Sequence, residues 1–86
     1  DILYLEAQKV YVVVHTVTGD YRTRIALSRF AALLDGTFFK VHRSYIVALK
    51  YVVKITRSEV TMVSGDTVPV SRGMYDAIHA ALIKYL

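Results

Sequence analysis

Short runs in which apolar and polar residues alternate make up most of the chain, and this pattern predicts strands rather than long helices. The runs are rich in β-branched and aromatic residues, which suit a pleated, half-buried surface. Polar or glycine-containing segments separate them. The predicted strands are residues 2–7, 10–17, 21–25, 38–41, 46–48, 53–56, 60–63 and 67–70.

Two turn signals and two periodic stretches complete the predicted elements. Glycine next to aspartate at 19–20 and at 64–66 predicts hairpin turns between neighbouring strands. A short helix that stops at Gly36 is predicted from the i, i+3, i+4, i+7 spacing of Leu27, Phe30, Ala31 and Leu34. A last helix, capped by Ser71, would bury the face formed by Met74, Ile78, Ala81, Leu82 and Tyr85. The predicted fold class is therefore mainly β, with two short helices.

Composition narrows the class of protein. Of 86 residues, 55% are apolar and 21% are charged, which is enough for a core, and residues 1–86 are predicted to form a single domain. The absence of cysteine excludes disulfides and thiolate chemistry and favours a reducing, cytoplasmic environment. The longest uncharged stretch, residues 10–19, is too short to span a membrane. Because the chain begins with Asp1 rather than methionine, we expect a piece excised from a longer protein.

The distribution of charge says more than the net value of +4. Residues 36–58 contain no acidic residue but five basic ones: Lys40, Arg43, Lys50, Lys54 and Arg57. A basic centre without carboxylates suits a polyphosphate surface. An ordinary solvated face that happens to be basic explains the same pattern, so charge alone leaves both interpretations open.

Residue types that carry catalysis or hold metals are present but scattered. His15, His42 and His79 are far apart, and the nearby Asp76 and His79 would supply only two ligands. His42 and Ser44 would share a strand face, but no third group orients the imidazole as a hydrolase requires. The glycines are too dispersed for a phosphate-binding loop. The sequence predicts no enzyme, no cofactor, no metal site and no small-molecule substrate.

Three connections between the predicted elements carry hydrogen-bond donors. They are Gln8-Lys9, the segment 40–45, and the segment 69–73 with Arg72 at the start of the last helix. A helix start favours anions, and arginine is shaped for two parallel hydrogen bonds to guanine or phosphate. Solvated turn residues are the alternative explanation for each connection taken singly.

The same segments carry a family resemblance over essentially the whole chain. Residues 39–47 (FKVHRSYIV) resemble the F-x-x-H-R-S-Y-I-V signature of the LytTR family, the LytR/AlgR-type DNA-binding domains of bacterial response regulators. Residues 2–7 (ILYLEA) resemble its I-x-Y-x-E-A strand, and residues 68–72 (VPVSR) resemble its I-P-V-S-R segment. Three ordered motifs make this resemblance specific.

The resemblance implies a fold and a mode of binding. It implies an elongated arrangement of three small antiparallel sheets with short helices. Loops, rather than a recognition helix, would enter successive major grooves of double-stranded DNA, bend it, and read paired direct repeats in promoters. We therefore expect a sequence-specific DNA-binding output domain of a bacterial transcriptional regulator that binds DNA as a dimer. A receiver or other sensor domain would precede it in the chain.

The resemblance also assigns roles to particular residues. Base contacts fall on Arg72, Lys9, Gln8 and Arg43, the last of which either reads a base or holds the backbone. Phosphate contacts fall on Lys40, Ser44 and His42, and His42 is alternatively a buried hydrogen-bonding residue.

Two residues depart from the family pattern. Val10 replaces a common polar residue of the first loop, so base reading there would rest on Gln8 or Lys9, and Ala48 replaces a common asparagine. The departures fit an alternative, a protein-interaction module of the same fold that has lost DNA binding. A small enzyme built on His42 and Ser44 is a further alternative, but the sequence offers no substrate pocket that would support it.

Overall fold

The computed structural model describes residues 1–33 and 36–86 and arranges them as two antiparallel sheets, one α-helix and two short 3-10 helices. The five-stranded sheet has the strand order β3-β2-β1-β5-β4. Its strands are β1 (Ile2–Ala7), β2 (Val12–Thr16), β3 (Gly19–Thr23), β4 (Phe38–His42) and β5 (Tyr45–Ala48). The mainly-β class predicted from the sequence is confirmed, and the described residues form two sheets rather than three.

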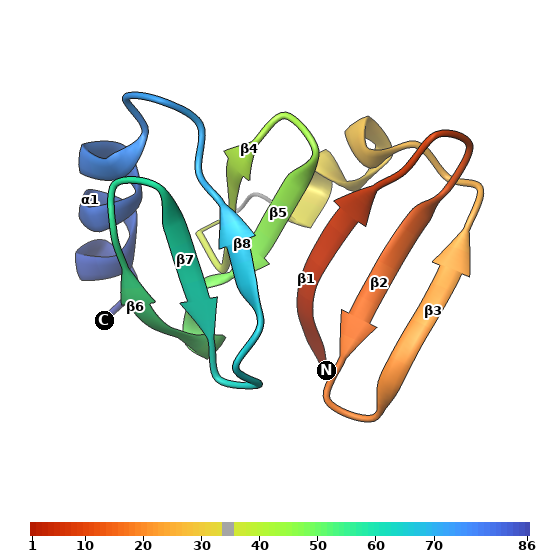
Figure 1. The fold of residues 1–86 in the computed structure, drawn as a ribbon, viewed down its shortest axis with the longest axis horizontal. Coiled ribbons are helices and arrows are strands. Elements are labelled where there is room, and N and C mark those ends of the chain that lie inside the picture. The colour runs from red at the N-terminus through yellow and green to blue at the C-terminus, as the bar shows by residue number, and fades with distance from the viewer. Residues whose placement is uncertain (34–35) are drawn as a thin grey trace.

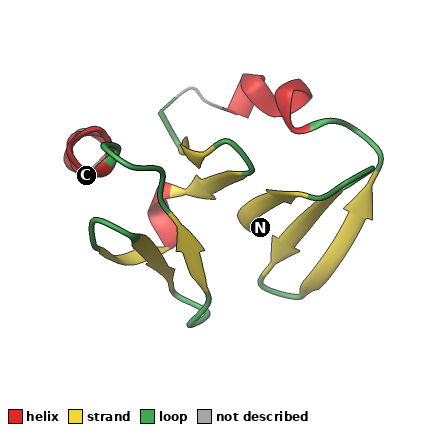
Figure 2. Cartoon of the chain, turned by 45° about the horizontal axis from the view of Figure 1, so that its top comes forward, coloured by secondary structure: helices red, strands yellow, loops and turns green. Residues whose placement is uncertain are grey.

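The second sheet is a three-stranded meander joined to the C-terminal helix. Its order is β6-β7-β8, and its strands are β6 (Val52–Ile55), β7 (Glu59–Met62) and β8 (Thr67–Pro69). The helices are the 3-10 helices η1 (Leu27–Leu33) and η2 (Leu49–Tyr51) and the α-helix α1 (Tyr75–Tyr85). Figure 1 and Figure 2 show α1 at one end of the molecule, with β3 at the other. The dimensions of 31 × 24 × 23 Å make the domain modestly elongated.

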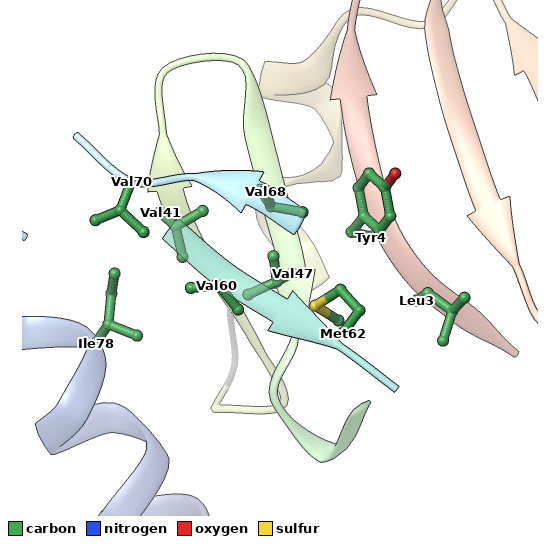
Figure 3. Packing of buried hydrophobic residues seen from close by; sticks show 9 residues of the cluster. All are labelled: Leu3, Tyr4, Val41, Val47, Val60, Met62, Val68, Val70 and Ile78. Atoms are coloured by element: carbon green, nitrogen blue, oxygen red, sulfur yellow. The ribbon is translucent and has the colours of Figure 1, made fainter. Parts of the chain in front are cut away.

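The larger core cluster lies between the two sheets and α1 (Figure 3). Its buried members are Leu3, Tyr4, Val41, Val47, Val60, Met62, Val68, Val70 and Ile78. Residues adjacent in a strand normally face opposite sides, yet Leu3 and Tyr4 both join this cluster. The pairing of β1 with β2 shifts register between Ile2 and Tyr4, and this irregularity explains the exception.

The opposite face of the five-stranded sheet packs on η1. Leu5, Val12 and Ile46 point to this side and bury Leu27, the first residue of η1. The five-stranded sheet is therefore covered on both faces, by η1 on one side and by the three-stranded sheet with α1 on the other. No described polar or charged residue is fully buried.

Tyr4 ties the two sheets together with a hydrogen bond. Its hydroxyl donates to Asp66 Oδ2, 3.2 Å away, in the turn between β7 and β8. Burial of the ring and the nearby Asp66 carboxylate raise the pKa of Tyr4 well above its ordinary value. The hydroxyl therefore remains a donor at any physiological pH.

Three sequence predictions about local structure are wrong in detail. The first hairpin turns at residues 17–18, two residues before the predicted position, and Gly19 opens β3 with φ +148°. The helix predicted from Leu27 is a 3-10 helix, and Leu34 lies outside the described residues. Ser71 does not cap α1, which begins four residues later after Met74. The backbone N–H of Ser71 donates to Val41 C=O, 2.9 Å away, and Gly73 has φ +82°, so no helix can run through this segment.

Candidate nucleic-acid interface

The topology gathers the donor-rich connections at one edge of the molecule. β1 and β4 both pair antiparallel with β5, so they run in the same direction and end at the same edge. The β1–β2 loop, the β4–β5 turn and the β8–α1 connection all lie along the upper edge in Figure 1. All three connections predicted from the sequence are therefore brought together.

Backbone hydrogen bonds hold these connections in a continuous row. Ala7 N–H donates to Ser44 C=O, 2.8 Å away, which joins the β1–β2 loop to the β4–β5 turn. The bond from Ser71 N–H to Val41 C=O joins the end of β4 to the β8–α1 connection. We call this row, residues 8–10, 43–44 and 71–73, the connection edge.

The β1–β2 loop presents its polar residues to solvent. Gln8 N–H donates to Tyr11 C=O, 2.8 Å away, and closes a tight turn. Gln8 and Lys9 are exposed, and Val10 is 66% exposed at the same turn. The side chains predicted to read bases from this loop are thus accessible.

The β4–β5 turn presents Arg43 and keeps its neighbours closer to the fold. Arg43 is exposed, Ser44 is half-buried, and Lys40 is exposed within β4 rather than in the turn. Ser44 N–H donates to His42 Nδ1, 3.1 Å away, and the half-buried His42 ring meets the edge of Tyr45 with 5.6 Å between ring centroids. Because Nδ1 accepts this bond, His42 shapes the turn, and a neutral ring carries its proton on Nε2.

A fourth connection, missed in the sequence, extends the edge. Val70 N–H donates to Ser58 C=O, 3.0 Å away, so the β6–β7 turn lies beside the β8–α1 connection. Arg57 in this turn lines the same pocket as Arg72, and its guanidinium carbon lies 5.0 Å from the centroid of the Tyr75 ring. The sequence feature that could have indicated this connection is the position of Arg57, directly after a predicted strand and within the acid-free stretch.

The basic side chains of the described residues have no carboxylate partner within the fold. Among the residues that the structure describes, none of the 11 lysine and arginine side chains forms an ion pair with a carboxylate. Glu6, Asp20 and Asp66 instead bond to histidine or tyrosine side chains. The arginines of the connection edge can therefore engage a phosphate or a base without first breaking an ion pair.

The scattered histidines do not form a metal centre. Within residues 1–33 and 36–86, no group of three or more His, Cys, Asp or Glu side chains is arranged to hold a metal ion. His79 stacks on Tyr75, with 5.9 Å between ring centroids. In the described part of the chain, no helix is both long and apolar enough to cross a membrane.

Of the two departures from the family pattern, only Val10 lies on the connection edge. Ala48 is buried at the end of β5, opposite Phe38 and at the other edge of the sheet. Ala48 therefore has no direct bearing on contacts made by the connection edge.

Comparison with known proteins decides the family. The family model of the LytTr DNA-binding domain matches residues 1–83. The chain belongs to the LytTR family of DNA-binding domains. A solved structure with the same fold is the LytTr DNA-binding domain of a protein described as a methyl-accepting/DNA response regulator from Bacillus cereus. It is 30% identical, with a TM-score of 0.78 over 95% of this chain and 80% of that one.

A curated relative places the LytTR domain among transcriptional regulators. The chain is 35% identical over 88 residues to the CO-responsive transcriptional regulator RcoM of Rhodospirillum rubrum. The match covers 94% of this chain but only 37% of the relative. These findings support a DNA-binding regulator domain, and the LytTR family is not a class of enzymes.

Proposed function

We propose that this LytTR domain binds double-stranded DNA sequence-specifically, as the output domain of a bacterial transcriptional regulator, through its connection edge. The observation that carries the proposal is a row of four neighbouring connections. Their basic side chains are exposed and have no carboxylate partner among the described residues. Loops of this kind would enter the major groove, where each base pair presents a distinct pattern of donors and acceptors.

The contacts divide into base readout and phosphate positioning. Arg72, Lys9, Gln8 and Arg43 are the base-reading candidates, since all four are exposed on the connection edge. Phosphate contacts are assigned to Lys40, Ser44 and His42, with His42 acting through Nε2 because Nδ1 is occupied. Arg57 joins them as a phosphate contact beside Arg72.

The wider assembly follows from the same proposal. The domain would bind promoter direct repeats as a dimer on DNA, in the bacterial cytoplasm, with a receiver or other sensor domain N-terminal to it. Support comes from the response-regulator description of the B. cereus protein and from the length of RcoM, of which this chain matches only 37%. The two relatives differ in their described inputs, so the nature of the signal belongs to the partner domain.

The experiment that tests the function is selection of bound duplexes from a random pool at two salt concentrations. Wild type should enrich a paired repeat, and Arg72→Ala should blur that sequence at one position. Arg72→Lys is the matched control, because lysine keeps the charge but lacks the planar fork that bonds guanine twice. Salt-sensitive binding with no enriched sequence would reduce the role to phosphate contact. Absence of binding at both salts would favour a protein-interaction module.

A further inference from the structure

A cluster of polar side chains lies on the five-stranded sheet directly behind the connection edge. Glu6 of β1 stands at its centre. The Tyr45 hydroxyl donates to Glu6 Oε2, 3.2 Å away, and His15 Nε2 lies 3.0 Å from Glu6 Oε1. Glu6 thus bonds on one side to β5 and on the other to β2.

His15 holds Glu6 in a fixed position. Its second ring nitrogen, Nδ1, lies 2.9 Å from Asp20 Oδ1 on β3, and its ring stacks on Tyr4 with 4.1 Å between centroids. Because each ring nitrogen faces one carboxylate oxygen, the imidazole links Glu6 to Asp20. The His15 and Glu6 side chains are 14% and 25% exposed, so water competes weakly with their contact.

Tyr45 connects Glu6 to the β4–β5 turn. It follows Ser44 directly, and its ring packs against His42, which accepts the N–H of Ser44. On the other side of the turn, Ala7, the neighbour of Glu6, donates its N–H to Ser44 C=O. Burial of the ring and the Glu6 carboxylate raise the pKa of Tyr45, so its hydroxyl remains protonated and able to donate. The turn that presents Arg43 is therefore held from both sides.

We propose that Glu6 is a positioning residue for DNA binding: by accepting the Tyr45 hydroxyl while His15 holds its other oxygen, it keeps the β4–β5 turn in its binding conformation before DNA arrives. The inference rests on the proposed function, because it assigns Arg43 and Ser44 to the DNA interface. Ordering the turn in advance lowers the entropy lost on binding, and this gain matters most where a side chain must meet one base in one geometry.

The first test is Tyr45→Phe, which removes one hydroxyl and keeps the ring. Affinity for the selected duplex should fall by ~3- to 10-fold, the range for one hydrogen bond, while affinity for scrambled DNA stays close to that of wild type. Tyr21→Phe is the matched control, because Tyr21 is an exposed tyrosine of β3 remote from the turn, and it should change neither affinity. Equal loss on both duplexes, or no loss, would overturn the proposal.

A double-mutant cycle tests whether Glu6 acts through Tyr45. Once Glu6→Ala is present, Tyr45→Phe should cause little further loss, whereas independent losses that multiply would contradict the mechanism. Glu6→Gln should retain more affinity than Glu6→Ala, because the amide oxygen still accepts the hydroxyl. Thermal unfolding of each variant separates this effect from misfolding, and Tyr45→Phe alone decides the matter if Glu6→Ala does not fold.

Amide hydrogen exchange in the DNA-free protein separates this proposal from the proposed function. Tyr45→Phe should speed exchange at the amides of Ala7 and Ser44 and leave β7 unchanged. Unchanged exchange at these two amides would overturn the positioning role even if DNA binding is specific. Failure of wild type to select a sequence would overturn the proposed function, while the exchange experiment would still decide whether Tyr45 orders the turn.

Discussion

The connection edge and the polar cluster behind it use charge in opposite ways. Arg43 and Arg72 are exposed and have no carboxylate partner among the described residues, whereas the Glu6, His15 and Asp20 side chains bond to one another, with polar atoms within 3.0 Å. Unpaired cations keep their affinity for an external anion, at some cost in mutual repulsion. Side chains that bond to one another instead contribute orientation. Changes at the edge should therefore alter binding but not folding, whereas changes behind it should alter the order of the β4–β5 turn and, through it, binding.

The largest effect is expected from the core, where binding plays no part. Met62 is fully buried between the sheets, and Met62→Ala should lower the free energy of unfolding by about 2–5 kcal/mol through lost contacts and a residual cavity. Val63→Ala, at the exposed neighbouring position, should change it by less than ~0.5 kcal/mol. Urea unfolding of both variants measures the difference. A Met62→Ala protein as stable as wild type would contradict the assigned core.

Arg72 should show the converse behaviour. Arg72→Ala should weaken binding to the selected duplex by about 1–3 kcal/mol, because one base loses a paired contact. The unfolding temperature should stay unchanged, since the side chain is exposed and makes no ion pair with a described carboxylate. Equilibrium binding and thermal unfolding of the same preparation test both statements. Equal losses on selected and scrambled DNA would remove Arg72 from the base-reading residues.

Tyr4 gives the sheets a pH-dependent link. Its pKa in the folded protein lies above that in the unfolded chain, so the unfolded state loses its proton first as pH rises. Stability should be fully present below about pH 10 and should decline above it. Tyr4→Phe should cost about 1 kcal/mol at neutral pH, by loss of the bond to Asp66, and should make the alkaline decline shallower. The test is urea unfolding of Tyr4→Phe at several pH values, with Tyr21→Phe as the control. An alkaline slope of Tyr4→Phe equal to that of wild type would contradict this assignment.

Lys40 should have the smallest and least sequence-dependent effect. Lys40→Ala should weaken all duplexes alike and reduce the slope of log affinity against log salt by ~0.9, the value for one phosphate contact. Lys50→Ala, in η2 at the opposite edge, should leave the slope unchanged. Titrations at several salt concentrations distinguish the two variants. Identical slopes for Lys40→Ala and wild type would place Lys40 outside the interface.

The alternation of apolar and polar residues predicted the strands well. Alternation depends on which face of a strand is buried, and each of the two sheets buries one or both of its faces. The same patterns could not distinguish α from 3-10 geometry over Leu27–Leu33, since an i, i+3 spacing suits both. They also could not place the start of α1. Ser71 is a residue type that commonly caps helices, and only the three-dimensional structure shows that its N–H bonds to β4 instead.

The connection edge was predictable in its parts, and its assembly required the three-dimensional pairing. Motifs identified the three donor-rich segments, but the β1–β5 pairing that aligns them joins residues about 40 positions apart in the chain. Glu6 lies within the motif of residues 2–7, but the sequence did not predict its partners, because Glu6, His15 and Asp20 belong to three strands and have no motif spacing. Arg57 belongs to the acid-free stretch, but its place beside Arg72 could not be predicted because the two residues are distant in sequence.

The central place of β1 in the five-stranded sheet has a consequence for synthesis of the protein. The strands of the β1–β2–β3 meander can pair as soon as they leave the ribosome, but the other edge of β1 stays unpaired until β5 has been synthesised. Ser71 reaches β4 later still. A nascent chain therefore carries an open strand edge that invites wrong partners until β5 arrives. Only a chain that extends past Ser71 acquires the assembled connection edge, so shorter chains should lack the proposed binding surface.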